Sequence, residues 1–227
     1  AANYKLPASG TTKAWKIVNG DIEAVIIGAT GLTYNGLDQI LATVDITVPT
    51  SGTTVTYTID GTSVSSPEAK NAGTYTVVAT VSATGYNSKV LTASVTIAQK
   101  SLTITADDKT VTYGDEKPDL TESYDGFVNG ETKTVLDGTL VMDTTYDKGS
   151  NVGTYPITIT GYTSDNYEIA FVDGILHVSP ASFSVSISGT YVYTGTEQTV
   201  SYTVTGADGT PLMPGKDYTV KGVDRAT

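Results

Sequence analysis

The sequence predicts an all-β fold made of small β-sandwich modules of about 80 residues arranged end to end. Thr and Val are used heavily, 41 and 24 times, against only 11 Leu. β-branched residues lose rotamer freedom in helices and fit the pleated surface of a strand, so this composition favours strands. Apolar and polar residues also alternate, and 23 Gly and 8 Pro supply turns. An internal period, the third observation, sets the module length.

Two independent landmarks give that period. A tyrosine-containing turn is centred on Tyr34, Tyr113 and Tyr193, at intervals of 79 (113 − 34) and 80 (193 − 113) residues. An Asn-x-Gly-Thr-Tyr element begins at Asn71 and again at Asn151, an interval of 80. Because both landmarks agree on one interval, we interpret the chain as a series of similar modules.

The period divides the chain into four parts. We expect residues 1–19 to be the terminal hairpin of a preceding module, and residues 20–99 and 100–180 to be two complete sandwiches. Residues 181–227 are expected to begin a third module, truncated because the counterpart of Asn151 would fall near position 231 (151 + 80). Only residues 98–100 and 179–181 separate the outermost strands of neighbouring modules, so we expect little relative motion.

Period-two alternation marks the strands within the modules. Apolar side chains alternate with Thr or other polar residues in five clear runs, at 55–59, 75–81, 91–97, 102–104 and 155–159. Turn signals lie at 60–61, 85–87, 173–174 and 208–209. No stretch shows sustained helical periodicity, and residues 127–131 are expected to form at most a single helical turn. Strands with one apolar face predict two sheets packed face to face, with Thr outward.

The Asn-x-Gly-Thr-Tyr element predicts an immunoglobulin-like arrangement. In such sandwiches a Tyr at the start of the penultimate strand donates its hydroxyl back to the backbone just upstream, which is called a tyrosine corner. Tyr75 and Tyr155 each follow a Gly turn and open an alternating strand. The alternative is a strand tyrosine packed on the core with a hydrated hydroxyl.

Several landmarks of the second module occur in a characteristic order. They are Leu102-Thr-Ile-Thr-Ala, Thr112-Tyr113-Gly114-Asp115, Tyr124-Asp-Gly-Phe-Val-Asn-Gly-Glu131, Gly153-Thr-Tyr-Pro-Ile157 and Val172-Asp-Gly-Ile-Leu-His-Val178. Residues 100–180 thus resemble the MBG ("mostly beta, glycine-rich") repeats of the Tyr-Gly-x type, found in large bacterial surface and adhesin-like proteins. Residues 20–99 are similar to another bacterial surface immunoglobulin-like repeat but lack the Gly-Phe-Val-Asn-Gly segment. The resemblance implies an exported bacterial stalk or adhesin segment, with no catalytic residues.

Composition excludes several classes of protein. The absence of Cys rules out disulfide frameworks, Cys-based zinc sites and thiol catalysis. A net charge of −11 opposes binding to a nucleic-acid backbone. No apolar run approaches the roughly 20 residues that span a bilayer, so no membrane insertion is expected. The segment Ala1-Ala2-Asn3 lacks the regions of a secretion signal.

The sequence predicts no catalytic, cofactor-binding or metal site, and therefore no enzyme and no cofactor. The single histidine, His177, alternates with Leu176 and Val178 and should face outward, without partners for a metal site or a triad. Carboxylates are paired at 107–108, at 115–116 with 119, and at 143 with 147. Acid–base catalysis would need one of them in a cleft with a raised pKa, whereas carboxylates on turns are expected to be solvated.

The polar side chains offer two further possibilities, a calcium site and a covalent cross-link. Residues 100–180 hold 5 Lys and 14 Asp or Glu, net −9, so a calcium ion near the junction at 99–100 is one alternative. A Lys–Asn isopeptide cross-link is another, with Lys70, Lys89 and Asn87 as candidates by residue type.

Exposed aromatic faces are the remaining candidate for binding, since they stack on sugars. The candidates are Trp15 and four tyrosines in loop-like contexts, Tyr86, Tyr124, Tyr146 and Tyr162. Expected partners are neighbouring modules of the same polypeptide, and a glycan or a host-surface protein bound through loops. Weak self-association is also expected, because residues 3–18 of one copy could cover the apolar face and sheet edge of residues 181–227 in another.

We therefore expect a non-enzymatic spacer or stalk segment of a large bacterial cell-surface or secreted adhesin-like protein. An acidic, Thr-coated exterior suits that role because it keeps a rod soluble. One alternative is an adhesin module that binds glycan or host protein through its loops. Another is an accessory module of a secreted hydrolase.

Overall fold

The computed structural model describes residues 18–190, 192, 194–196, 201–207 and 209–219. In these residues the chain is all-β, as predicted, and the single 3-10 turn η1 (Lys133–Val135) is its one short helical element. Most of the expected hairpin at 1–19 and the landmark Tyr193 lie outside the described residues. No helix among the described residues is long and apolar enough to cross a membrane.

The structure divides into two compact units. Unit 1 holds the described residues up to Leu102, together with the segments Gly126–Leu136 and Thr163–Glu168. Unit 2 holds Thr103–Asp125, Asp137–Tyr162 and the described residues from Ile169 onward. Unit 1 thus combines the predicted module at 20–99 with two turn-bearing segments from later in the chain.

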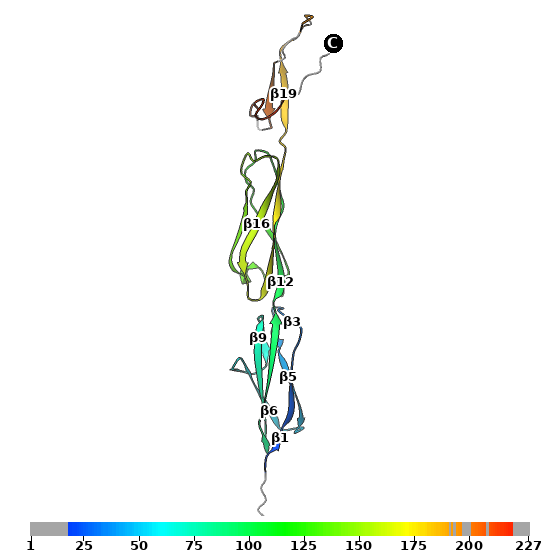
Figure 1. The fold of residues 1–227 in the computed structure, drawn as a ribbon, viewed down its shortest axis with the longest axis vertical. Helices are drawn as coiled ribbons and strands as arrows, with labels where there is room; N and C mark the ends of the chain where they lie inside the picture. The colour runs from blue at the N-terminus through cyan, green and yellow to red at the C-terminus, as the bar shows by residue number, and fades with distance from the viewer. Residues whose placement is uncertain (1–17, 191, 193, 197–200, 208, 220–227) are drawn as a thin grey trace, which may run out of the picture. The chain divides into compact units, whose positions relative to one another are not determined.

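A five-stranded sheet forms one layer of unit 1. Its order is β3 (Leu32–Thr33), β11 (Lys89–Ala98), β9 (Gly73–Ala83), β6 (Thr53–Ile59) and β7 (Thr62–Val64). β6, β9 and β11 run antiparallel side by side, whereas β3 pairs with the end of β11 in parallel (Figure 1). Parallel pairing here joins two strands that are distant in sequence, because β3 lies near the start of the module.

The second layer of unit 1 is a pair of antiparallel strands, β2 (Glu23–Gly28) and β5 (Ala42–Val48). Short pairs join β1 (Gly20–Asp21) to β10 (Tyr86–Asn87) and β4 (Gln39–Ile40) to β8 (Glu68–Ala69). Ile22, Ala24 and Val81 form a buried cluster against which side chains of β5, β6 and β11 pack. Burying apolar faces of both layers gives roughly 25 cal/mol per Å², the main stabilising contribution.

Alternation along the strands is confirmed. On β9 the side chains of Val77, Ala79 and Val81 are fully buried, while Thr74 and Thr76 are exposed. The same division of faces gives β9, β11 and β16 an apolar inner surface and a Thr-rich outer surface.

Two further sheets contain the segment at 100–180. One has the order β14 (Glu122–Asp125), β12 (Lys100–Ala106) and β17 (Tyr167–Val172). The other has the order β13 (Lys109–Thr112), β18 (Gly174–Ser179), β16 (Gly153–Thr163) and β15 (Asp137–Thr144). Each sheet contributes a buried apolar row, which fits a β-sandwich: Leu102, Ile104 and Ala106 from the first, and Ile157, Ile159, Leu176 and Val178 from the second.

The start of the predicted third module is an antiparallel pair, β19 (Phe183–Ser188) and β20 (Ser201–Gly206). Phe183, Val185 and Ile187 alternate along β19 and are all exposed. Their expected cover, residues 3–18 of another copy, lies almost wholly outside the described residues, so this self-association stays a prediction.

Candidate functional site

A turn in unit 1 carries an acidic side chain, Glu131, that two buried tyrosines bind. The turn is formed by Asn129 and Gly130, both at positive φ, and is closed by the Glu131 N–H, which donates to the Val128 carbonyl at 2.9 Å. The expectation of a single helical turn at 127–131 is wrong, because Asn129 and Gly130 adopt the left-handed conformation and the 3-10 turn η1 lies further along the chain. The turn places the Glu131 side chain between two tyrosines.

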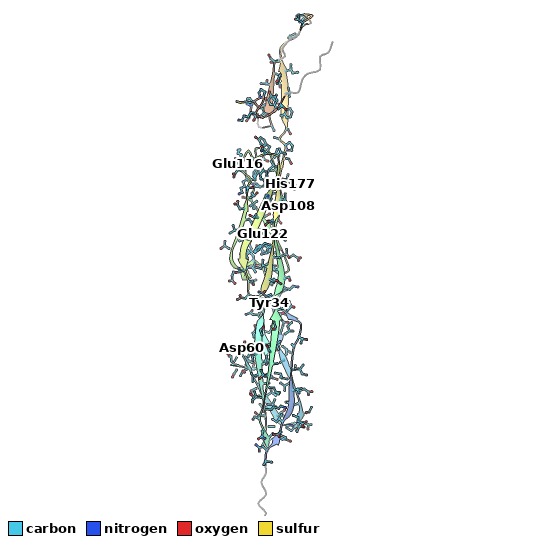
Figure 2. All side chains as sticks on the ribbon, viewed as in Figure 1. Tyr34, Asp60, Asp108, Glu116, Glu122 and His177 are labelled. Carbon is cyan, nitrogen blue, oxygen red and sulfur yellow. The ribbon has the colours of Figure 1, made fainter. Side chains whose placement is uncertain are left out.

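The Glu131 carboxylate is shared by two phenols. The Tyr34 hydroxyl donates to Oε1 at 2.7 Å, and the Tyr167 hydroxyl donates to Oε2 at 2.6 Å. The two rings meet edge to face with centroids 5.4 Å apart, and they are 3% and 2% exposed. Hydrogen bonds to an ionised acceptor are about twice as strong as neutral ones, so this arrangement binds three distant parts of the sequence together. We call these three residues the Glu131 bridge (Figure 2 labels Tyr34).

Both phenols of the bridge are held in the neutral, donating form. Burial raises the pKa of Tyr34, and the hydrogen bond to Glu131 and its negative charge raise it further. Burial and the same carboxylate raise the pKa of Tyr167 to about 12, although the Val128 N–H, which donates to its oxygen at 3.1 Å, acts in the opposite direction. A neutral phenol donates to a carboxylate, whereas a phenolate would repel it.

Close approach of backbone supports the bridge. The Asn129 amide donates to the Gly36 carbonyl at 3.2 Å. Gly36 has φ of 76°, and a Cβ placed there would lie 2.8 Å from the Asn129 Cβ. Only glycine tolerates both the backbone conformation and this contact.

Asn166 makes a second set of contacts within unit 1. Its Oδ1 accepts the Ala72 N–H at 2.9 Å, and its Nδ2 donates to Asn71 Oδ1 at 3.3 Å. Its carbonyl accepts the Lys100 N–H at 3.0 Å. One asparagine therefore satisfies backbone donors from two segments that are far apart in sequence.

Gln99 is the single residue between β11 and β12, and its side chain is also engaged. Its amide donates to the carbonyls of Ser164 and Asp165, at 3.2 and 3.1 Å. The passage from one predicted module to the next is thus held by side-chain and backbone hydrogen bonds.

Both predicted tyrosine corners are confirmed. The Tyr75 hydroxyl donates to the Asn71 carbonyl at 2.8 Å, and the Tyr155 hydroxyl donates to the Asn151 carbonyl at 2.9 Å. In each case the acceptor lies four residues upstream. The alternative of an unbonded, hydrated hydroxyl is therefore wrong for both.

The paired carboxylates lie on turns and in ion pairs. Asp108 and Asp115 accept backbone N–H groups from Ile175 and Thr112, and Asp107 accepts the Thr121 hydroxyl. Glu116 and Asp143 pair with Lys148 and Lys117 at 2.6 and 2.8 Å, and the hydrogen bond from Lys117 lowers the pKa of Asp143. Within the described part of the chain, no three acidic or histidine side chains gather into a group that could hold a metal ion.

His177 is exposed on the outer face of β18, as predicted. Its position along the chain is labelled in Figure 2. Its neighbours across the sheet are Thr110 on β13 and Thr154 on β16, while Leu176 and Val178 are buried on the other face. An exposed histidine between two threonines of the sheet is an ordinary outer-face residue.

The aromatic candidates divide into different settings. Tyr146 is 0% exposed, donates its hydroxyl to the Asp115 carbonyl at 2.7 Å and packs edge to face on Tyr155, so its expected role as a sugar-stacking platform is wrong. Tyr86 packs against the Ile22 cluster. Tyr124 and Tyr162 are half-buried, and Trp15 lies outside the described residues.

The isopeptide candidates occupy surface positions. Lys70 is exposed, and the Asn87 amide donates to Asp21 Oδ1 at 2.9 Å. An isopeptide bond between these residues or Lys89 stays a prediction, which intact mass measurement would test through the loss of ammonia.

Glu131 and Asn166 were not singled out by sequence reasoning. Glu131 closes the Gly-Phe-Val-Asn-Gly-Glu segment that carried the family resemblance, and Tyr34 marks a turn of the period. The sequence feature that could have pointed to Glu131 is that it is a single acidic residue at the end of an otherwise apolar and turn-forming segment.

The family comparison bears on the part of the chain that holds this segment. Residues 102–177 match the family model of the MBG domain of the YGX type. This segment is an MBG domain. The match includes the Glu131 turn, Tyr155 and Tyr167, and it confirms the family resemblance seen in the sequence.

Comparisons of the whole chain add little to the MBG assignment. No curated protein matches the chain. A solved structure of the Bacteroides ovatus mixed-linkage glucan utilization locus protein SGBP-B, in complex with a mixed-linkage heptasaccharide, aligns with 86% of this chain and 67% of its own at 17% identity. The TM-score is 0.27, which is too low to support an inference about fold or ligand.

Proposed function

We propose that this chain is a non-enzymatic structural spacer, part of the stalk of a large bacterial cell-surface or secreted adhesin-like protein. The MBG domain at 102–177 and the all-β fold support this class. In this proposal, successive sandwiches are arranged end to end and hold another domain away from the cell.

The observation that carries the proposal is the way the chain passes from β11 to β12. Only Gln99 lies between these strands, and its amide, the Asn166 contacts and the Glu131 bridge all stabilise this passage within unit 1. A spacer holds a constant distance only if the chain does not bend between its modules. Short, hydrogen-bonded connections oppose such bending.

The threonine-rich outer faces support the spacer role. Exposed threonines alternate with buried apolar residues on β9, β11 and β16. Together with the net charge of −11, such faces keep an extended protein soluble and oppose lateral pairing of sheets.

Small-angle X-ray scattering of the 227-residue chain tests the proposal. A compact particle of this length would have a radius of gyration of about 17 Å. We expect a value well above that and a distance distribution with a long tail. A compact distribution would overturn the proposal, whatever the chain binds.

Two alternatives remain predictions. Binding of glycan or host protein through the loops would appear as a signal on a glycan array or in a pull-down with a defined host protein. An accessory role in a secreted hydrolase would be decided by the domains that accompany this chain in its parent protein.

A further inference from the structure

In both predicted modules, strands near the start run beside strands at the end and in the same direction. In residues 20–99, β1 pairs in parallel with β10, and β3 pairs in parallel with β11. In residues 100–180, β13 pairs in parallel with β18. The part of the chain that enters each module is therefore hydrogen-bonded to the part that leaves it.

Parallel pairing decides how such strands respond to tension along the chain. Tension pulls the early strand from its amino-terminal end and the late strand from its carboxyl-terminal end. In a parallel pair these two points lie at opposite ends of the ladder, so the strands must slide past each other and all their hydrogen bonds are strained together. In an antiparallel pair the two points would lie at the same end, and the bonds would break one after another.

The pair of β13 and β18 in unit 2 carries further hydrogen bonds at both ends of its ladder. All four residues of β13 have partners on β18. Directly before β13, the Asp108 carboxylate accepts the Ile175 N–H at 2.7 Å, and directly after it the Tyr113 N–H donates to the Ser179 carbonyl at 2.8 Å. Because a hydrogen bond to a carboxylate is stronger than one between neutral groups, Asp108 adds strength where tension enters the pair.

The two parallel pairs of unit 1 are shorter and also carry hydrogen bonds beyond their ladders. β1 and β10 share two residue pairs, and the Asn87 amide of β10 donates to Asp21 Oδ1 of β1 at 2.9 Å. β3 and β11 share two residue pairs, and the Tyr34 N–H, directly after β3, donates to the Ala98 carbonyl at 2.8 Å. Each short ladder is thus extended by one more bond between the same two parts of the chain.

The Glu131 bridge adds a further connection beside the pair of β3 and β11. Tyr34 directly follows β3, and its hydroxyl is bound by Glu131, which lies 33 positions (131 − 98) after Ala98 at the end of β11. The bridge therefore joins the part of the chain before β11 to the part after it. Tension that pulls Tyr34 toward the amino terminus must break this charge-assisted bond as well as the short ladder.

We propose that the three parallel pairs, β1 with β10, β3 with β11 and β13 with β18, are mechanical clamps that keep the chain folded under tension, and that the Glu131 bridge reinforces the clamp of β3 and β11. This inference rests on the proposed function and adds a second task to it, because a spacer that only holds a distance need not resist pulling. Tension arises in a stalk whenever the domain it carries is held while the surface behind it moves away.

Single-molecule stretching of the full chain at constant force tests the clamps. The sequence has no Cys, so one cysteine added at each end provides two unique attachment points. We expect Asp108→Ala and Glu131→Ala each to unfold at least about tenfold faster than the parent at the same force, because each loses a carboxylate that bonds across a clamp. Asp108→Asn keeps an acceptor oxygen and should be intermediate.

The matched control is Tyr155→Phe. It removes the hydroxyl bond to the Asn151 carbonyl, which lies outside every clamp. We expect its unfolding rate under force to stay within about twofold of the parent, because that bond does not join an early strand to a late one.

A change of pulling direction tests the clamps without removing any of their bonds. Thr84 is exposed in the turn before β10, so Thr84→Cys takes a handle there in place of the carboxyl-terminal one. Tension then reaches the partners Gly20 and Tyr86 from the same end of the ladder, and β1 peels away from β10. We expect unit 1 to unfold at least about tenfold faster than with terminal handles at the same force.

Equal unfolding rates in the two pulling directions would overturn the proposal. So would Asp108→Ala and Glu131→Ala variants that unfold under force no faster than Tyr155→Phe. X-ray scattering reports the spacer role separately: an elongated particle with equal rates in both directions rejects only the clamps, whereas a compact particle rejects the spacer role.

Discussion

At the residue scale, the tyrosine corners are the features most directly tied to the sequence. Tyr75 and Tyr155 each donate a hydroxyl to a carbonyl four residues upstream. We expect Tyr75→Phe and Tyr155→Phe each to lower the free energy of unfolding by about 1 kcal/mol, the usual net value of one hydrogen bond. Urea denaturation measures the change, and the double variant should lose about the sum because the two sites share no partner.

Tyr113→Phe is the control for the corners, since its ring is 45% exposed. We expect it to change stability by less than about 0.5 kcal/mol. Corner variants as stable as this control would show that the hydroxyl bonds contribute nothing.

We expect substitutions in the Glu131 bridge to change stability more than substitutions in the tyrosine corners. Glu131→Ala removes the acceptor of two buried phenolic hydroxyls, so we expect a loss of about 3 kcal/mol. Glu131→Gln keeps one acceptor oxygen but no charge, and should cost about half as much. Denaturation gives the energies, and hydrogen exchange should speed up at the amides of Tyr34 and Tyr167.

Glu116→Ala is the matched control, because Glu116 makes an exposed ion pair with Lys148. Exposed pairs contribute about 0–1 kcal/mol. Equal effects of the two alanine substitutions would contradict a special role for the Glu131 bridge.

At the scale of the strands, whether a contact could be predicted from the sequence depended on how many residues separate its two partners. The corners could be predicted because donor and acceptor are four residues apart and follow one turn. The Glu131 bridge could not, since Tyr34 and Glu131 are 97 positions apart and only folding brings them together.

Tyr146 was expected to lie exposed in a loop, and that expectation was wrong for a different reason. The alternation of β15 continues past its last residue: Thr144 and Tyr146 are buried while Asp143 and Thr145 are exposed. Carrying the period of two beyond the expected strand end would have placed this tyrosine inside.

Gly161 on β16 tests the contact between neighbouring strands. It has φ of 116°, and a Cβ placed there would overlap the Thr139 carbonyl oxygen of β15. Gly149 also has a positive φ, 88°, but its Cβ would meet nothing within 4 Å. Both alanine substitutions strain the backbone at a positive φ. The difference between their free energies of unfolding therefore measures the cost of the steric overlap at Gly161.

We expect Gly161→Ala to be less stable than Gly149→Ala by about 2 kcal/mol, a typical cost of overpacking. Thermal and urea unfolding of both variants measure this difference. Equal stabilities would mean that β15 and β16 can separate at Gly161 without loss.

At the scale of the whole molecule, buried tyrosines make stability depend on alkaline pH. Burial raises the pKa of Tyr34, Tyr75, Tyr124 and Tyr146, and raises that of Tyr167 to about 12. In the unfolded chain these phenols ionise near pH 10. The folded state therefore binds more protons than the unfolded state above that pH, and stability must fall as pH rises.

The expected profile is flat, as far as tyrosines are concerned, below about pH 9 and falls between about pH 10 and 12. Each such tyrosine contributes a slope of at most about 1.4 kcal/mol per pH unit. Tyr167→Phe should have a shallower slope than the parent protein in this range, because one phenol with a raised pKa is gone. Urea midpoints across the pH series, with tyrosinate absorbance of the folded protein, test this; an identical slope for the variant would mean that Tyr167 ionises as readily when folded as when unfolded.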